Sequence, residues 1–377
     1  MADVVSTLAA PHRKRDATAA SATAIRPEAP RRALVVGASG LLGENLCRRV
    51  AETPGWQLTT LSRRPPAVAG SAHVSLDLKA HDHCLAHASA LADITHVFFC
   101  ARELSKGYGI DVDVNGEMLA NLLDALADGA PHLRHVQLMH GLKWYGTHVG
   151  PVRIPAREDD PAHADSSFYL RQQEDLIRRC ARSGWTWSTI RPHFLCAFAT
   201  GSPSNLVLML GTFASLLKEM GDDLWFPGSQ DAFDAVTGCA DIDLVTSAML
   251  WAASEESCAN NAFNIGNGDV FRWRDVWPLI AETFGLRPGP VRITDLPAYM
   301  ADKGPVWERL AARRGLKPLP LDQLADWHFA QNNVFGLAWD VVPSLVKAHR
   351  HGFHEVVDTG EMFARLFARY RSAGILP

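Results

Sequence analysis

One short stretch near the start of the chain constrains the fold more than any other: Ala33-Leu34-Val35-Val36-Gly37-Ala38-Ser39-Gly40-Leu41-Leu42-Gly43. Its four leading apolar residues predict a buried parallel strand, and the three glycines after them open a helix. A turn of this kind binds a dinucleotide, because its glycines allow a tight turn, a close approach to the pyrophosphate and close packing of helix on strand. The pyrophosphate would lie at the helix N-terminus, where N–H groups and the helix dipole favour an anion. We therefore expect Gly37, Ser39, Gly40, Leu41, Leu42 and Gly43 to form a site that binds a dinucleotide.

Length and charge narrow the possible partners. The 377 residues suffice for about two domains, and the net charge of -4 is spread over interspersed acidic and basic residues. Because no basic surface is indicated, we expect neither nucleic acid nor an anionic membrane as a partner. The longest apolar stretch, from Leu206 to Leu217, is shorter than the about 20 residues of a membrane span and predicts a buried helix. Small molecules, and a second copy of the chain in a possible homodimer, are the expected partners.

The N-terminal segment and the cysteines bear on compartment. Residues 1–31 are rich in Ala, Ser, Thr, Arg and Pro without sustained apolar periodicity, which predicts a disordered arm. Its acidic residues and its missing apolar core are untypical of a secretory signal, whereas an organelle-targeting role stays open. The seven cysteines are scattered without a C-x-x-C pair, which favours reduced thiols and a cytoplasmic protein.

The alternation of strands and helices predicts an α/β fold, a Rossmann-type doubly wound parallel sheet, which we place at 32–193. Residues 194–377 should form mainly a smaller, mostly helical substrate-binding lobe, with some segments returning to the sheet. We expect strands at 33–36, 57–62, 73–78, 95–101, 135–141 and 186–192, and a helix with an apolar stripe from Met118 to Leu126. Aromatic residues gather in the second part, where most should be core and some should close an apolar pocket over the cofactor: Phe194, Phe198, Trp225, Phe226, Phe233, Trp273, Trp277, Trp327, Phe329, Phe335 and Trp339.

The second strand ends in Arg63-Arg64, which bears on the choice of cofactor. An acidic residue there would bind the ribose 2′-hydroxyl of NAD, whereas an arginine offers a fork for the 2′-phosphate of NADP. NADPH is therefore the expected cofactor, and the competing interpretation is a pair of solvated loop arginines. Asp77, after the third strand, could meet the adenine amino group or could be an ordinary residue of a strand end.

Other catalytic and metal patterns are weak. His81-Asp82-His83 lacks a recognised ligand spacing, so no metal site is expected. Asp241 and Asp243 precede an apolar helix and are better explained by capping than by acid catalysis. No G-x-S-x-G turn is present, which argues against a serine hydrolase.

A short-chain dehydrogenase would carry a lysine four residues after its catalytic tyrosine, where the ammonium lowers the pKa of the phenol. Here Gln173 stands four residues after Tyr169, and a neutral amide cannot supply that charge. Lys143, just past the fifth strand, could supply it from another direction. A core role for Tyr169 and a surface role for Lys143 are the competing interpretations.

Several motifs in order resemble the progesterone 5β-reductase/iridoid synthase family over about residues 32–377: the glycine turn, Ser62-Arg63-Arg64-Pro65, Asp93-Ile94-Thr95-His96-Val97-Phe98, Gly141-Leu142-Lys143-Trp144-Tyr145, Ser167-Phe168-Tyr169, Trp187-Ser188-Thr189-Ile190-Arg191-Pro192, the stretch from Asn261 to Phe271, Trp327-His328-Phe329 and Gly352-Phe353. That family comprises atypical extended short-chain dehydrogenases that use NADPH to reduce activated carbon–carbon double bonds. The resemblance implies that Tyr169 and Lys143 are catalytic. Further cofactor contacts are expected from Leu78, Cys100, Ala101, Met139, Pro192 and Phe194, and substrate contacts from Arg102, Trp144, Tyr145 and Phe198.

The chain departs from the family pattern at a few positions. Ser167 and Leu170 flank the Phe-Tyr pair where the family has asparagine and tyrosine, and one extra residue precedes Glu174. Ala101-Arg102 replaces a Thr-Trp pair, which removes a large aromatic side chain and adds a charge near the predicted pocket. The expected reaction is 1,4-reduction of an enone or enal, with hydride added to the β-carbon and the enolate stabilised by Tyr169 and Lys143. A sugar-nucleotide epimerase or dehydratase and a catalytically silent NADP-sensing protein are the alternatives.

Overall fold

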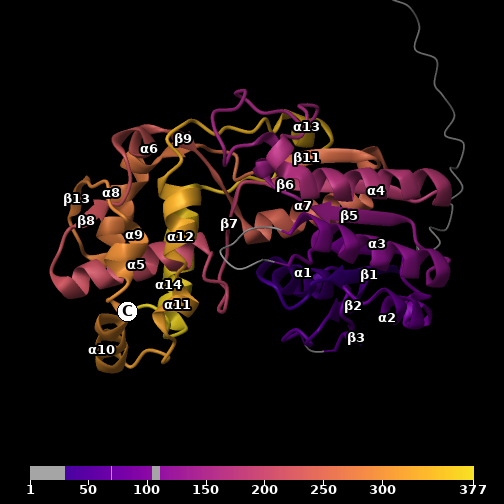
Figure 1. The fold of residues 1–377 in the computed structure, drawn as a ribbon, viewed down its shortest axis with the longest axis horizontal. Helices are drawn as coiled ribbons and strands as arrows, with labels where there is room; N and C mark the ends of the chain where they lie inside the picture. The colour runs from indigo at the N-terminus through magenta and orange to yellow at the C-terminus, as the bar shows by residue number, and fades with distance from the viewer. Residues whose placement is uncertain (1–29, 69, 104–110) are drawn as a thin grey trace, which may run out of the picture.

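The computed structural model describes residues 30–68, 70–103 and 111–377. Its main sheet has seven parallel strands in the order β11-β6-β5-β4-β1-β2-β3, with β1 next to the point where the strand order reverses (Figure 1). This sheet confirms the predicted doubly wound α/β fold, in which ligands bind outside the carboxyl ends of the strands at the reversal. The strands run over Arg31–Val36 (β1), Trp56–Ser62 (β2), Ala72–Ser75 (β3), His96–Phe99 (β4), His135–Met139 (β5), Thr186–Pro192 (β6) and Asn261–Ile265 (β11).

The first strand begins at Arg31, inside the segment that the sequence predicts to be a disordered arm. Arg31 and Arg32 are in register with Trp56 and with the residue after it on β2. The backbone N–H of Arg32 also donates to the hydroxyl of Thr95 at 2.8 Å. These pairings extend the sheet beyond the apolar run, because a ladder of backbone hydrogen bonds does not require apolar side chains at its end. The rest of the predicted arm, residues 1–29, lies outside the described residues.

Helices cover both faces of the main sheet. Helices α1 (Leu41–Glu52) and α7 (Ile242–Ser254) pack together and share one apolar core with the sheet. Helices α2 (His81–Ala86), α3 (Val112–Gly129) and α4 (Ser167–Ser183) contribute to a second core. The predicted apolar stripe of α3 is buried in this second core, so the stripe holds the helix on the sheet.

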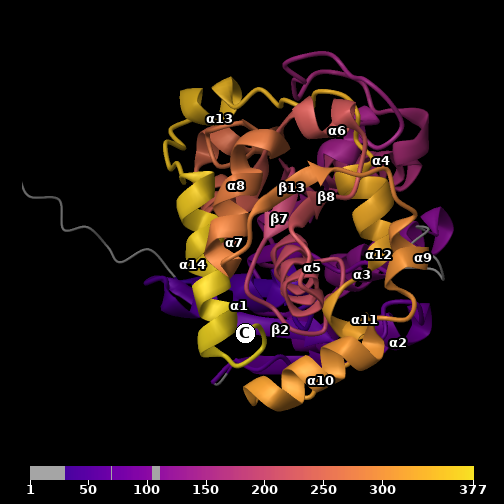
Figure 2. The same ribbon diagram turned by 90° about the vertical axis from the view of Figure 1, so that its left-hand side faces the viewer.

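The second lobe is built around α5 (Leu206–Met220), which Figure 2 shows at its centre. The residues from Leu206 to Leu217 are all buried, as the sequence predicts. No helix in the described part of the chain is long and apolar enough to cross a membrane. Around α5 lie the longer helices α8 (Trp273–Phe284), α10 (Gly304–Arg314) and α14 (Thr359–Ser372), and the short helices α6 (Gln230–Asp234), α9 (Leu296–Met300), α11 (Leu321–Leu324), α12 (Trp327–Phe329) and η5 (Ala330–Phe335, a π-helix). The short helix α13 (Val346–Arg350) packs instead against β11 of the main sheet.

Short strands and aromatic side chains complete this lobe. Its two-stranded ladders pair β7 (Phe194–Cys196) with β10 (Cys239–Asp241), β9 (Val236–Thr237) with β12 (Phe271–Arg272), and β8 (Leu224–Phe226) with β13 (Pro288–Val291). Much of the aromatic cluster forms the core of the lobe, which contains Trp225, Phe226, Trp273, Trp277 and Phe335. The other six aromatics of the prediction are partly buried at the edge of this core or of a smaller cluster, so core positions account for five of the eleven rather than for most of them.

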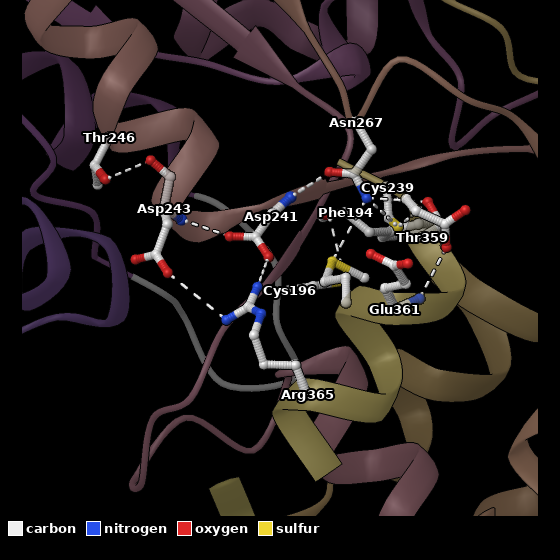
Figure 3. A network of polar contacts seen from close by, with 12 residues as sticks. Phe194, Cys196, Cys239, Asp241, Asp243, Thr246, Asn267, Thr359, Glu361 and Arg365 are labelled. Atoms are coloured by element: carbon white, nitrogen blue, oxygen red, sulfur yellow. Dashed lines mark hydrogen bonds and ion pairs between the residues drawn. The ribbon is translucent and has the colours of Figure 1, made fainter. Parts of the chain in front are cut away.

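A polar network fastens the C-terminal helix α14 to α7 (Figure 3). Asp241 caps α7 by accepting from the backbone N–H of Asp243 at 2.7 Å, which confirms the predicted capping role. The guanidinium of Arg365 on α14 forms an ion pair with the buried Asp241 carboxylate. Asn267 accepts from the backbone N–H of Asp241 at 2.7 Å and donates to Thr359, at the start of α14, at 3.0 Å. The network thereby fixes the second lobe against the Rossmann domain.

Candidate active site

A cleft of about 550 Å³ lies at the carboxyl edge of the main sheet. The sheet side contributes the glycine turn and residues that follow β2, β4, β5 and β6. The second lobe contributes the N-terminal end of α5, Phe329 on α12 and Asn333 on the π-helix η5. The cleft is thus built from both parts of the chain, at the position that an open parallel sheet offers to ligands.

The glycine turn has the geometry that its sequence predicts. Gly37 has a φ of +79°, and a Cβ there would lie 2.7 Å from the backbone of Ala101. A Cβ on Gly43 would lie 2.2 Å from the carbonyl oxygen of Gly37. Both positions therefore require glycine, the first for its conformation and the second for the contact of helix with turn. Gly40 precedes the first turn of α1 and lines the cleft without a side chain, so backbone N–H groups at the helix start are open to an anion.

The two arginines after β2 are placed differently. Arg63 lines the cleft, and its guanidinium lies 3.8 Å from the Glu103 carboxylate, which also pairs with Lys79 at 3.3 Å. Arg64 is absent from the described residues that line the cleft; its carbonyl oxygen accepts from the Ser62 hydroxyl at 2.5 Å. Only Arg63 therefore faces the region where a ribose 2′-group would bind. The other predicted cofactor residues that line the cleft are Ser39, Leu41, Leu42, Asp77, Leu78, Cys100, Ala101, Met139, Pro192 and Phe194.

Cys100 follows β4 and is a free thiol, as are the other six cysteines, all of which lie in the described part of the chain. Burial strongly raises the pKa of the Cys100 thiol, with a smaller contribution from Cys47. Because the thiol stays protonated, it contributes apolar volume to the cleft rather than a nucleophile.

Tyr169 lies in the first turn of α4 and is buried in the wall of the cleft. The Ser166 side chain fixes the start of this helix, because the single proton of its hydroxyl is shared between the carbonyl oxygens of Trp144 and His163, at 2.8 and 2.7 Å. The Tyr169 hydroxyl lies beside Gly141, where a Cβ would come within 3.5 Å of it. Burial raises the pKa of Tyr169, and the charge of Arg102 and a hydrogen bond with it oppose that rise. The phenol is therefore protonated at neutral pH and can donate a hydrogen bond.

Lys143 reaches the same cleft from η2 (Leu142–Tyr145), the turn after β5. Its Nζ donates to Oδ1 of Asn333 at 2.7 Å. Burial and the charge of Arg102 lower the pKa of Lys143 to about 8. The amine is still mostly protonated at pH 7, so Lys143 adds a positive charge to the cleft, while Arg102 is the cation that contacts the Tyr169 hydroxyl.

Gln173, one turn after Tyr169, is absent from the described residues that line this cleft. Its amide oxygen accepts from the Thr189 hydroxyl at 3.3 Å and lies 3.5 Å from the guanidinium of Arg191. The position that holds lysine in a Tyr-x-x-x-Lys pair therefore serves the packing of α4 on the sheet.

Of the four predicted substrate contacts, only Arg102 lines the cleft among the described residues. Trp144 stacks against the guanidinium of Arg191 at 3.8 Å, and the Tyr145 hydroxyl donates to Asn264 at 2.7 Å. Both rings of the short turn η2 are therefore buried beside polar partners, and neither ring lines the cleft in the described part of the chain. Phe198 packs against α14, with its ring centroid 4.8 Å from that of Tyr370.

The cleft contains polar residues that the sequence analysis did not predict, above all His140, His148 and Asn333. His140 stands directly after β5, so its place at the carboxyl edge of a strand was an available signal. Asn333 is 190 residues from its partner Lys143, and no local pattern indicates that contact. No group of three or more His, Cys, Asp or Glu side chains in the described ranges could hold a metal ion.

Comparisons with known proteins agree with this geometry. A family model described as a PRISE-like Rossmann-fold domain matches residues 75–377. (S)-8-oxocitronellyl enol synthase from Nepeta cataria is 31% identical over 370 residues, which cover 92% of this chain and 91% of that enzyme. 3-oxo-Δ4,5-steroid 5β-reductase from Arabidopsis thaliana is 30% identical over 362 residues, 92% of this chain and 93% of that enzyme. The structure of UDP-glucose 4-epimerase from Thermus thermophilus, in complex with NAD, superposes with a TM-score of 0.63 at 18% identity. The match covers 91% of this chain and 99% of that enzyme, and at this identity it shows a similarity of fold alone.

Proposed function

Since the chain belongs to the PRISE family, we propose that it is a reductase of activated carbon–carbon double bonds, which uses NADPH to reduce an enone or enal. The observation that carries the proposal is the protonated Tyr169 hydroxyl, which is held in the cleft beside Gly141 and in contact with Arg102, with Lys143 lining the same cleft. The names of the two relatives support it, because one specifies an enol product and the other a steroid with a double bond conjugated to a ketone.

The residues of the cleft fit a nicotinamide dinucleotide. Gly40 leaves room for a pyrophosphate at the N-terminus of α1, and the side chains after β4, β5 and β6 line the continuation of the cleft toward Tyr169. Bound NADPH would supply the hydride. Arg63 favours NADPH over NADH, because it is the arginine that faces the cleft after β2 and a guanidinium can bind a phosphate through two N–H groups.

Stabilisation of the developing enolate is the chemical task of the protein side chains. As hydride adds to the β-carbon, negative charge develops on the carbonyl oxygen of the substrate. The Tyr169 hydroxyl donates a hydrogen bond to that oxygen, and the ammonium of Lys143 stabilises the same charge through space. Proton transfer to the α-carbon then completes the reduction. Preorganised donors of this kind are the largest single source of rate in many such sites.

Replacement of Tyr169 by phenylalanine tests the assignment. The variant should bind NADPH as the parent does but transfer hydride to a small enal about 10²–10³-fold more slowly, the typical loss for one oxyanion donor. Single-turnover loss of NADPH absorbance measures that rate. Tyr145→Phe is the matched control, because it removes a buried hydroxyl that bonds Asn264 and lies outside the described lining of the cleft.

Three outcomes would contradict the assignment. If Tyr169→Phe transfers hydride within about threefold of the parent rate, the activation free energies of the two proteins differ by less than ~0.7 kcal/mol. Tyr169 would then have no part in the mechanism. A parent protein that binds the nicotinamide cofactor but reduces no enone or enal would favour a silent binding protein. Tightly bound NAD and turnover of a nucleotide sugar would favour an epimerase, although Gln173 replaces the lysine which that chemistry requires.

A further inference from the structure

Cationic groups gather at the end of the cleft where Tyr169 lies. Arg102 and Lys143 both line this end, and the charge of Arg102 contributes to the lowered pKa of Lys143. His148 also lines it, and its pKa is lowered by burial and then by the charge of Lys143, which favours a neutral ring. The two charged groups, Arg102 and Lys143, therefore lie close enough for their like charges to oppose one another, and a bound anion would relieve this repulsion.

No carboxylate of the described residues forms an ion pair with Arg102 or Lys143. Glu103 lines the cleft but is paired with Arg63 and Lys79. The positive charge at this end of the cleft is therefore not neutralised by the part of the chain that the structure describes.

A second, independent feature of this end of the cleft is a set of buried histidine ring nitrogens that have no hydrogen-bond partner among the described residues. His140 is 4% exposed and lines the cleft with its ring 4.5 Å from that of Tyr169, yet neither Nδ1 nor Nε2 has a hydrogen-bond partner among the described residues. Nδ1 of His148 is likewise buried and unpartnered in this part of the chain. A buried polar group without a partner costs free energy, so these nitrogens indicate a polar ligand at this end of the cleft.

We propose that this end of the cleft binds an anion, and that the natural substrate is an unsaturated oxo acid whose carboxylate pairs with Arg102. The inference rests on the proposed reductase function and narrows its substrate class. A guanidinium binds a carboxylate through two parallel N–H groups, which fixes the orientation of the substrate as well as its position. Because Arg102 also contacts the Tyr169 hydroxyl, the carboxylate would lie close to the carbonyl group that Tyr169 polarises.

A pair of probes separates charge recognition from chemistry. We choose (E)-2-oxo-3-pentenoate, whose carboxylate is attached to the reacting carbonyl, and its neutral methyl ester. The parent protein should show a kcat/KM for the acid at least tenfold above that for the ester. Arg102→Leu should lower the value for the acid about a hundredfold and change that for the ester less than threefold, while Arg102→Lys should recover part of the loss.

Arg171→Leu is the matched control, because Arg171 lies on α4 two residues after Tyr169 but pairs with the exposed Asp113 and lies outside the described lining of the cleft. It should leave the ratio of the two kcat/KM values unchanged. If Arg102→Leu slows both probes equally, Arg102 acts only on Tyr169 and the substrate class is wrong. An effect confined to the KM for NADPH would place Arg102 on the cofactor instead.

A binding experiment tests the anion site independently of the reductase function. If neither probe is reduced, the proposed function is wrong. Calorimetry then measures how tightly the saturated acid 2-oxopentanoate and its methyl ester bind to the NADP⁺ complex. Binding of the acid at least tenfold more tightly than the ester, with the difference lost in Arg102→Leu, would support the anion site. Equal binding of the two compounds would overturn it.

Discussion

Lys143 combines two features that oppose each other at the scale of a single residue. Its ammonium stabilises a developing enolate only while it is protonated, but burial and the charge of Arg102 lower its pKa from 10.5 to about 8. The hydrogen bond to Asn333 holds the amine in place and favours the charged form. A charge in so unfavourable an environment is typical of functional sites, because it is retained for activity rather than for stability.

The pH dependence of the reaction follows from this pKa. Lys143 is mostly charged below about pH 8 and mostly neutral above it, so kcat/KM for a neutral enal should be nearly flat from pH 6 to about 7 and fall with a midpoint near 8. The raised pKa of Tyr169 keeps the phenol protonated over this range, and the lowered pKa of His148 favours its neutral ring.

Lys143→Arg is the control for this prediction, because a guanidinium does not lose its proton below pH 10. Rates of NADPH oxidation from pH 6 to 10 should show the fall in the parent and none in the variant, even if the variant is slower throughout. A fall with the same midpoint in both proteins would assign it to another group.

At the scale of elements, the sequence predicted the strands and helices near the glycine turn well, since their apolar patterns are local properties. Strand ends were less accurate: β3 stops at Ser75 rather than at Leu78, because paired hydrogen bonds with β2 end at Ser62. The inward orientation of Trp144 and Tyr145 was not predictable, because it depends on the distant partners Arg191 and Asn264. Periodicity reports which face of an element is apolar, not which residue from another lobe meets it.

The π-helix η5 is the element that illustrates this limit, because it brings Asn333 to Lys143. Asn333→Ala removes the acceptor of a buried ammonium, so it should lower the free energy of unfolding by roughly 1–3 kcal/mol. It should also shift the pH midpoint of kcat/KM below that of the parent, since the lost hydrogen bond favoured the charged amine. Urea unfolding and the pH profile measure the two effects.

The neighbouring variant Asn332→Ala is the matched control, because Asn332 is exposed and is absent from the described lining of the cleft. It should change neither quantity. If Asn333→Ala leaves the midpoint where it is in the parent, the contact between η5 and Lys143 has no role in setting the charge of the site.

At the scale of the whole molecule, the cleft exists only when the two lobes are correctly joined. The glycine turn and Tyr169 belong to the Rossmann domain, whereas Asn333 and Phe329 come from the second lobe. The network around Asp241, Arg365 and Asn267 holds these parts together (Figure 3). A ligand that binds this cleft therefore binds the folded chain and not the unfolded one, so it should stabilise the molecule as a whole.

This linkage gives a measure of cofactor preference that does not depend on turnover. NADPH at about 100 times its dissociation constant should raise the free energy of unfolding by about 2.7 kcal/mol. NADH at the same concentration should raise the free energy of unfolding by at least about 1.4 kcal/mol less, because a guanidinium–phosphate contact is worth roughly a factor of ten or more in affinity.

Arg63→Ala should remove most of this difference between the two cofactors, since Arg63 lines the cleft. Arg64→Ala should preserve it, since Arg64 is absent from the described lining of the cleft. Urea unfolding of the three proteins with each cofactor provides the comparison, and equal stabilisation of the parent by NADPH and NADH would mean that Arg63 does not select the 2′-phosphate.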